Sequence, residues 1–245
     1  FLSARSYGDH PYGSTGDGTI ETVTALTRDD VIAAHKGAIA LDRIYVAASG
    51  DITAADLGAL LDKLLADLPE SGLPLPPSAE RLDKGGIAIK PYPGPQSVVL
   101  FAQGGIAFDD PDFFAANLLN DVLGGGRFSA RLMTEVREKR GLTYGIGAGW
   151  SSRDLSEEWV GQFKASNEKV AEAIAVVQAE WAKMAAEGMT EDELTTAKTY
   201  MTGSYPLRFE GNGPIASILV GMQMLGLPAD YPKTRNDKVN AVTMD

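Results

Sequence analysis

Arg137 and Tyr144 are the two side chains whose types and spacing point to chemistry on a peptide group. A guanidinium offers a rigid fork of N–H donors, and a phenol offers an O–H donor. Together they can hold a peptide carbonyl, or stabilise the oxyanion that forms when water attacks it. The structural alternative is that Arg137 pairs with a nearby glutamate on the surface while Tyr144 packs in a sheet. Residue types alone leave both interpretations open.

The elements around this pair must bring it together across a chain reversal. A helix is predicted over 129–140, with Gly141 as its stop, because glycine readily adopts the left-handed conformation that ends helices. An extended run over 142–150 follows. Arg137 then lies in the last helical turn and Tyr144 near the beginning of the strand. Seven residues across such a reversal can place the two side chains in contact.

A run of three glycines, Gly124, Gly125 and Gly126, precedes that helix. Between two helical patterns, such a run can expose backbone N–H groups to a ligand at a helix start. It is not a Walker A loop, since no Gly-Lys-Ser/Thr follows, and it does not follow a strand as a dinucleotide loop would. We therefore take the three glycines as candidates for substrate binding. The alternative is a flexible connection between helices.

Metal and nucleophile chemistry have little support in the sequence. The chain holds two histidines, His10 and His35, and no cysteine. No His-x-x-x-His pair presents two imidazoles to zinc, and no Gly-x-Ser-x-Gly elbow supports a serine nucleophile. His10 is expected in a loop and His35 late in a helix. The residues therefore predict no metal site in this chain.

Composition limits the classes of partner. The 245 residues are 44% hydrophobic and 22% charged, which is ordinary for a globular protein. A net charge of −11 argues against nucleic acid, since phosphate binding needs clustered lysine and arginine. No apolar run reaches the roughly 20 residues of a membrane span. The lack of cysteine fits a cytoplasmic or a periplasmic protein equally.

A proline-rich connector over 69–84 divides the chain into a region over 1–68 and a region over 85–245. In the first region, 1–26 is expected to be irregular. A capping box at Thr27 predicts a helix through His35, with Asp30 in the usual place of Glu. A buried strand over 44–48 and a helix over 53–68 with a leucine-rich face follow.

The second region alternates pairs of strands with runs of helices. Strands are predicted over 87–89, 97–102, 142–150 and 158–165. Helices are predicted over 111–123, 129–140, 167–186, from 190 onward and over 214–225, with a break at Pro206. This order favours an α+β fold with a largely antiparallel sheet over alternating β/α units.

The run 123–144 closely resembles the C-terminal half-signature of the M16 (pitrilysin/insulinase, mitochondrial processing peptidase) family. That family's Arg/Tyr pair matches Arg137 and Tyr144 here. Shorter agreements in order and spacing lie at 10–13 with 26–30, at 49–51, at 204–209 and at 240–243. The resemblance therefore spans nearly the whole chain, and the Arg/Tyr segment is its most specific part.

The resemblance implies two-layer α+β domains, with two halves forming a chamber around the substrate. Zinc is held by an inverted His-x-x-Glu-His motif on one half, and the Arg/Tyr pair on the other half orients substrate. That motif is absent here and would lie upstream of His10. Since the chain starts at Phe1 rather than Met, we expect an upstream part to be missing, and the first domain to be present only from its late portion.

Three roles are then open. The favoured one is the zinc-free subunit of a bacterial heterodimeric peptidase, inactive alone, that binds a peptide or unfolded protein and works with a zinc-bearing M16 partner. A homodimer is the other pairing considered, and the periplasm is the expected location, with the cytoplasm as alternative. The second role is a fragment of an active zinc subunit. The third is a non-proteolytic assembly homologue.

Overall fold

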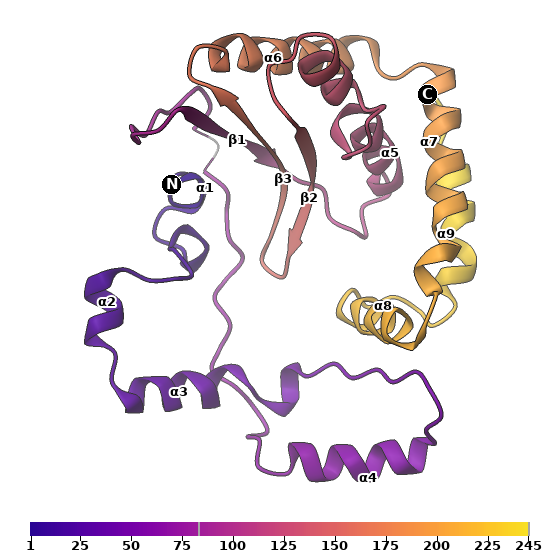
Figure 1. Ribbon diagram of the computed structural model, residues 1–245. Coiled ribbons are helices and arrows are strands. Elements are labelled where there is room, and N and C mark those ends of the chain that lie inside the picture. Colours follow the sequence, from indigo (N-terminus) through magenta and orange to yellow (C-terminus); the bar gives the residue numbers. More distant parts are fainter. Residues whose placement is uncertain (83, 245) are drawn as a thin grey trace. The chain divides into compact units, whose positions relative to one another are not determined.

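The computed structural model describes residues 1–82 and 84–244 (Figure 1). These residues form two compact units, each assembled from separate stretches of the chain. The first unit comprises 1–13, 78–82, 84–202 and 235–244, and the second comprises 14–77 and 203–234. The first unit contains the sheet and the segment that carries Arg137 and Tyr144.

A three-stranded antiparallel sheet organises the first unit. Its strands are β1 (Gln96–Gly104), β2 (Ile146–Arg153) and β3 (Ser156–Ser166), in the order β1-β3-β2. Strands β2 and β3 form a hairpin, in which Arg153 is opposite Ser156. β3 is central and pairs with β1 along all nine residues of that strand.

Nine α-helices are present in the part of the chain that the structure describes. They are α1 (Leu2–Tyr7), α2 (Ile20–Ala25), α3 (Arg28–Ala38), α4 (Ala54–Leu65), α5 (Phe113–Gly124), α6 (Val170–Glu187), α7 (Glu191–Ser204), α8 (Asn212–Met224) and α9 (Tyr231–Asn240). Short 3₁₀ turns η1 (Pro11–Gly13), η2 (Leu41–Arg43) and η4 (Pro206–Phe209), and a π-helix η3 (Met133–Glu138), complete the elements. No helix within 1–82 or 84–244 has the length and apolarity needed to cross a bilayer.

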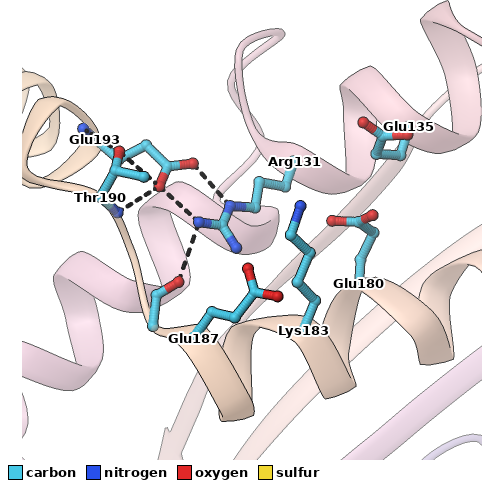
Figure 2. A pocket seen from close by; sticks show the side chains of 8 residues that line it. Arg131, Glu135, Glu180, Lys183, Glu187, Thr190 and Glu193 are labelled. Atoms are coloured by element: carbon cyan, nitrogen blue, oxygen red, sulfur yellow. Dashed lines mark hydrogen bonds and ion pairs between the residues drawn. The ribbon is translucent and has the colours of Figure 1, made fainter.

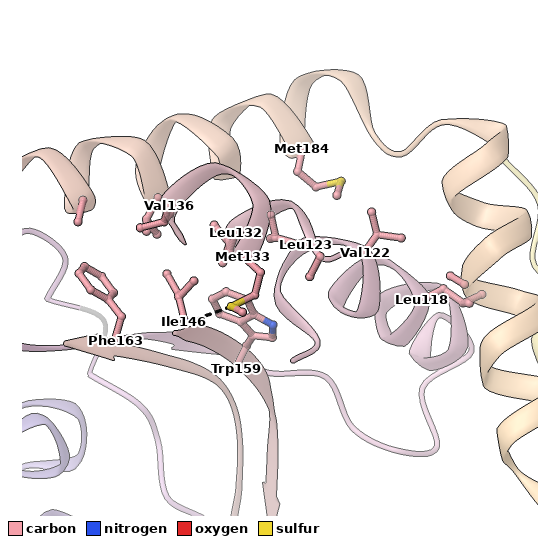
Figure 3. Close-up of a cluster of buried hydrophobic side chains, with 14 of the residues drawn as sticks. Leu118, Val122, Leu123, Leu132, Met133, Val136, Ile146, Trp159, Phe163 and Met184 are labelled. Carbon is pink, nitrogen blue, oxygen red and sulfur yellow. Dashed lines mark hydrogen bonds between the residues drawn. The ribbon is translucent and has the colours of Figure 1, made fainter. Parts of the chain in front are cut away.

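The core lies between one face of the sheet and the helices α5, α6 and η3 (Figures 1 and 3). Alternate residues of β3, including Trp159 and Phe163, turn toward the helices, as the period of two requires. The indole N–H of buried Trp159 donates to the Asn120 side-chain oxygen at 2.6 Å. The core therefore fixes α5 and η3 against the sheet. α5 ends at Gly124, the first glycine of the run, and η3 contains Arg137.

The N-terminal segment and the connector are joined to the β2–β3 hairpin. Glu158, 4% exposed, forms ion pairs with Arg81 and, at 3.4 Å, with Arg153. The Tyr7 hydroxyl is hydrogen-bonded to the Ser156 hydroxyl at 2.8 Å, and burial raises the pKa of this phenol. A buried acid between two arginines holds these distant stretches in one unit.

Most of the predicted elements are confirmed. The sheet is antiparallel and the helices come in runs, so the α+β prediction is correct. The Thr27 capping box is present, with the Thr27 hydroxyl accepting from the Asp30 N–H and the Asp30 carboxylate accepting from the Thr27 N–H. Residues 69–82 form neither helix nor strand, as their prolines predict.

Other predictions are wrong. Residues 44–48 and 87–89 form no strand, because a strand needs a hydrogen-bonded neighbour and none of the described residues pairs with them. The stretch predicted to be irregular holds α1 and α2, and α9 was not anticipated. The leucines of α4 are not buried, with Leu64 70% exposed.

Candidate functional site: an arginine between two exposed rings

The reversal after η3 has the geometry of a glycine-terminated helix. The Gly141 N–H donates to the Arg137 carbonyl at 2.8 Å, and the Leu142 N–H donates to the Val136 carbonyl at 2.9 Å. Gly141 has φ +58°, which a residue with a Cβ adopts only at a cost. Val136 and Leu142 are buried, so both sides of the turn are fixed to the core.

The predicted helix over 129–140 is shorter and of a different type. Its centre is the π-helix η3, in which the Lys139 N–H donates to the Thr134 carbonyl five residues earlier, at 2.9 Å. Single π turns are rare and are frequent at functional sites. Strand β2 also begins later than predicted, at Ile146, so Tyr144 lies in the loop before the strand rather than in it.

Arg137 and Tyr144 do come together across this turn. The Arg137 Cζ atom lies 5.4 Å from the centroid of the Tyr144 ring and 4.7 Å from that of the Phe128 ring. Tyr144 is 91% exposed and Phe128 is 64% exposed. Two accessible rings thus contact one guanidinium at cation–π distance.

The guanidinium of Arg137 has no carboxylate partner in residues 1–82 and 84–244. The nearby acid that could pair with it, Glu135, is already bound to Lys139 at 2.5 Å and to Arg140 at 2.6 Å. These hydrogen bonds, first from Arg140 and then from Lys139, lower the pKa of Glu135. The surface-pairing alternative for Arg137 is therefore not what the structure contains, and its donors remain available to a ligand.

At each glycine of the run, a different local constraint disfavours a larger residue. Gly124 is buried, and a Cβ there would lie 3.0 Å from the Ala148 Cβ. A Cβ on Gly125 would lie 2.6 Å from the Asp121 Cα, and Gly126 has φ +84°. Gly125 and Gly126 are exposed, whereas Gly124 is occupied by packing. Contact of the three glycines with substrate stays a prediction.

The residue after the glycines is anchored to α5. Arg127 forms an ion pair with the buried Asp121, and its Cζ lies 4.6 Å from the centroid of the Tyr200 ring. Burial raises the pKa of Asp121, and its hydrogen bond with Arg127 only partly offsets this effect. The pair fixes the chain direction at the point where Phe128 follows.

A cavity of about 330 Å³ lies between η3, α6 and the start of α7 (Figure 2). Arg131 spans it and binds both carboxylate oxygens of Glu193, at 2.6 and 2.7 Å. This pairing lowers the pKa of Glu193 to about 2. The walls carry four glutamates against Arg131 and Lys183. Arg131 is already bound to Glu193, and Glu135 to Lys139 and Arg140, so we assign the cavity a structural role.

The two histidines lie in different units. His10 lies in a loop, with its ring 5.0 Å from that of Tyr12, and His35 lies in the last turn of α3 in the other unit. In the described ranges, 1–82 and 84–244, no three histidine, aspartate or glutamate side chains are placed to hold a metal ion. The residues present therefore do not fit the zinc site that the resemblance implies for the M16 family.

Sequence reasoning missed Phe128. No role for this residue is predicted from the sequence. The available signal was an aromatic residue directly after a flexible, polar run, where a large exposed ring needs an explanation.

Comparison with known proteins identifies the family. Residues 25–201, which include Arg137 and Tyr144, match the family described as peptidase M16 inactive domain. The chain belongs to the peptidase M16 family. A crystal structure of an M16 inactive domain from Pseudomonas fluorescens has a TM-score of 0.80 and 30% identity, over 99% of this chain and 58% of that chain.

Curated M16 relatives differ in what their names claim. An uncharacterized zinc protease of Streptomyces coelicolor is 29% identical over 85% of this chain and 47% of its own length. A non-peptidase homolog of Helicobacter pylori is 24% identical over 99% of this chain and 56% of its own length. The chain thus spans about half the length of the curated relatives it matches.

The same fold occurs in a multi-subunit assembly. A chain of complex III2 from Candida albicans has a TM-score of 0.75 at 15% identity, over 99% of this M16 domain and 59% of that chain. At this identity the likeness shows the fold alone.

Proposed function

We propose that this M16 domain binds a peptide in extended form and presents Arg137 and Tyr144 to a zinc site carried by a partner subunit. The observation that supports this most directly is the state of Arg137. Its guanidinium lies beside an exposed phenol, with no carboxylate partner in the described part of the chain. An arginine kept unpaired on an acidic protein of net charge −11 has donors free for a ligand.

The chemistry assigned to the pair is hydrogen bonding to one peptide carbonyl. The guanidinium N–H groups of Arg137 donate to the carbonyl oxygen, and the Tyr144 hydroxyl donates as a second, neutral group. Donors fixed in advance are worth more in the transition state than in the ground state, because negative charge grows on that oxygen. Gly125 and Gly126 offer exposed backbone at the same edge for further contacts with the peptide.

The remaining parts of the proposal concern the assembly. The zinc and its Lewis-acid chemistry are assigned to a partner M16 chain, either a different subunit or a second copy. The segment 1–68 is assigned to the late part of a first M16-like domain, 69–84 to a linker and 85–245 to a second domain. The periplasm is the proposed location, with the cytoplasm as alternative. Fractionation of cells that express this protein tests the proposed location.

Peptide binding by this chain tests the central claim without a partner. With a fluorescently labelled unstructured peptide, Arg137→Ala is expected to weaken binding about 10- to 100-fold, the range for a hydrogen bond to a charged group. Tyr144→Phe, which removes only the hydroxyl, is expected to weaken it about two- to tenfold. Fluorescence anisotropy gives the dissociation constants.

Matched controls separate this role from general charge and surface effects. Arg28→Ala removes an exposed arginine elsewhere in the chain, and Tyr92→Phe removes the hydroxyl of another exposed tyrosine. Both are expected to bind peptide as the parent chain does. Unchanged binding by Arg137→Ala would refute the proposal. In a second step, cleavage by this chain together with a zinc-bearing M16 partner should be lost in the same two variants.

A non-proteolytic role is the second candidate. The relative that covers 99% of this chain is named a non-peptidase homolog, which favours it. Under this alternative the chain still pairs with an M16 partner. The unsubstituted chain and that partner then cleave no peptide at any zinc concentration. A third candidate, part of an active zinc subunit, is favoured by the Streptomyces relative's name. A His-x-x-Glu-His motif in any sequence upstream of residue 1 would establish this third role.

A further inference from the structure

Phe128 and Tyr144 contact the same guanidinium from two different segments of the chain. Tyr144 follows the Gly141 turn, whereas Phe128 precedes η3, and Arg137 lies between them in sequence. Of the two rings, Phe128 is the nearer to the Arg137 Cζ atom, at 4.7 Å against 5.4 Å. A phenylalanine ring has no hydrogen-bonding group, so its contribution here is the contact of its π face with the cation.

We propose that Phe128 is a positioning residue that holds the Arg137 guanidinium in place for the bound peptide. Arg137 has no ion pair in the described residues, so the carboxylates that usually fix an arginine do not fix this one. The stem of an unpaired arginine samples many rotamers, and ordering it on binding lowers affinity. Ring contacts restrict the side chain while leaving its N–H donors unoccupied.

The glycine run gives Phe128 its position. Arg127 is fixed by buried Asp121 and by the Tyr200 ring, and the Ala130 N–H donates to the Arg127 carbonyl at 3.1 Å. Ala130 is buried. Phe128 therefore lies between two anchored residues although its own side chain is 64% exposed. The loop at 124–129 thereby delivers a ring to Arg137, in addition to any contact it makes with substrate.

The geometric part of the inference is tested by NMR on the chain itself. Ring currents are expected to shift the Arg137 Cδ protons upfield, and Phe128→Leu should remove much of this shift while keeping an apolar side chain of similar size. Phe128→Tyr, which keeps the ring, should retain it. Tyr92→Leu, which removes another exposed ring elsewhere, should leave the Arg137 signals unchanged. Arg137 signals that are the same in Phe128→Leu and the parent chain would overturn the inference.

The functional part rests on the proposed function and is read from peptide affinity. Phe128→Leu is expected to weaken binding about two- to fivefold, the range for an exposed cation–π contact. Phe128→Tyr, which keeps the ring, is expected to bind the peptide as the unsubstituted chain does. In an Arg137→Ala background the Phe128 substitution should have no further effect, because its target is gone. A loss that persists in that background would overturn the positioning role. If Arg137→Ala itself leaves binding unchanged, the proposed function fails, and the NMR result still decides whether Phe128 holds Arg137.

Discussion

At the residue scale, the four arginines of the segment 127–140 differ in whether a carboxylate binds them. Arg127 is bound to Asp121, Arg131 to Glu193 and Arg140 to Glu135. Arg137 is the arginine of this segment that lacks an acid among the described residues. Glu135 is engaged by Lys139 and Arg140, and no described acid binds Arg137, so its fork of donors is not occupied by a carboxylate.

The Arg131–Glu193 pair predicts a specific dependence of stability on pH. The pKa of Glu193 is about 2 in the folded chain against an ordinary value of 4.5, chiefly because Arg131 donates to its carboxylate. Since the folded pKa is the lower, the pair stabilises above pH about 4.5, and this stabilisation is lost as pH falls toward about 2. Glu193→Gln is expected to cost about 1–3 kcal/mol near pH 7 and to reduce the slope of unfolding free energy in that window.

Urea unfolding at a series of pH values measures this effect. Glu191→Gln, which changes an exposed acid in the same helical turn, is the matched control and should leave the slope unchanged. Equal slopes for Glu193→Gln and the parent chain would contradict the assigned ion pair.

At the element scale, the site depends on how α5 ends against β2. Gly124 closes α5 and lies on Ala148 and Leu132, and the exposed turn through Gly125 and Gly126 starts there. The next element, η3, is fixed to the same core by its buried residues (Figure 3). The distance between Phe128 and Arg137 is set by these two packed elements.

Gly124→Ala is therefore expected to destabilise the chain by about 1–3 kcal/mol. The added methyl would lie 3.0 Å from the Ala148 Cβ and 3.1 Å from the Leu132 Cδ1, in a core that cannot expand freely. Gly149→Ala is the control in the facing strand, because nothing lies within 4 Å of a Cβ there. The difference between the two unfolding free energies is the measurement, and equal values would show that α5 does not pack on β2 as described.

At the scale of the whole molecule, burial is divided unequally between the two units. The first unit holds an extensive core, with Leu118, Leu132, Val136 and Val239 fully buried. In the described residues of the second unit, buried side chains are confined to Ala40, Tyr205, Met222 and Tyr231. Because local stability follows buried apolar contacts, the free energy of local opening should be larger in the first unit than in the second.

Hydrogen exchange followed by mass spectrometry is expected to show this difference. Amides of β3 should be the most protected, because the strand pairs on both sides and faces the core. Amides of α4, which has no buried residue, should exchange within the shortest times sampled. Comparable protection of α4 and β3 in the 245-residue chain would contradict the division of burial.

The sequence by itself determined the local elements around the site. Glycine's freedom at positive φ predicted the stop at Gly141, and hydrophobic spacing predicted the helices and the paired strands. The Arg137–Tyr144 spacing across the turn allowed a contact between the two side chains but left surface pairing of Arg137 open. Only the tertiary structure decided what depends on neighbours distant in sequence. Residues 44–48 are apolar enough for a strand but pair with no strand among the described residues, and the leucines of α4 remain at least partly exposed there. The Phe128 contact also required three dimensions, because it depends on the packing of α5 and η3 against one sheet.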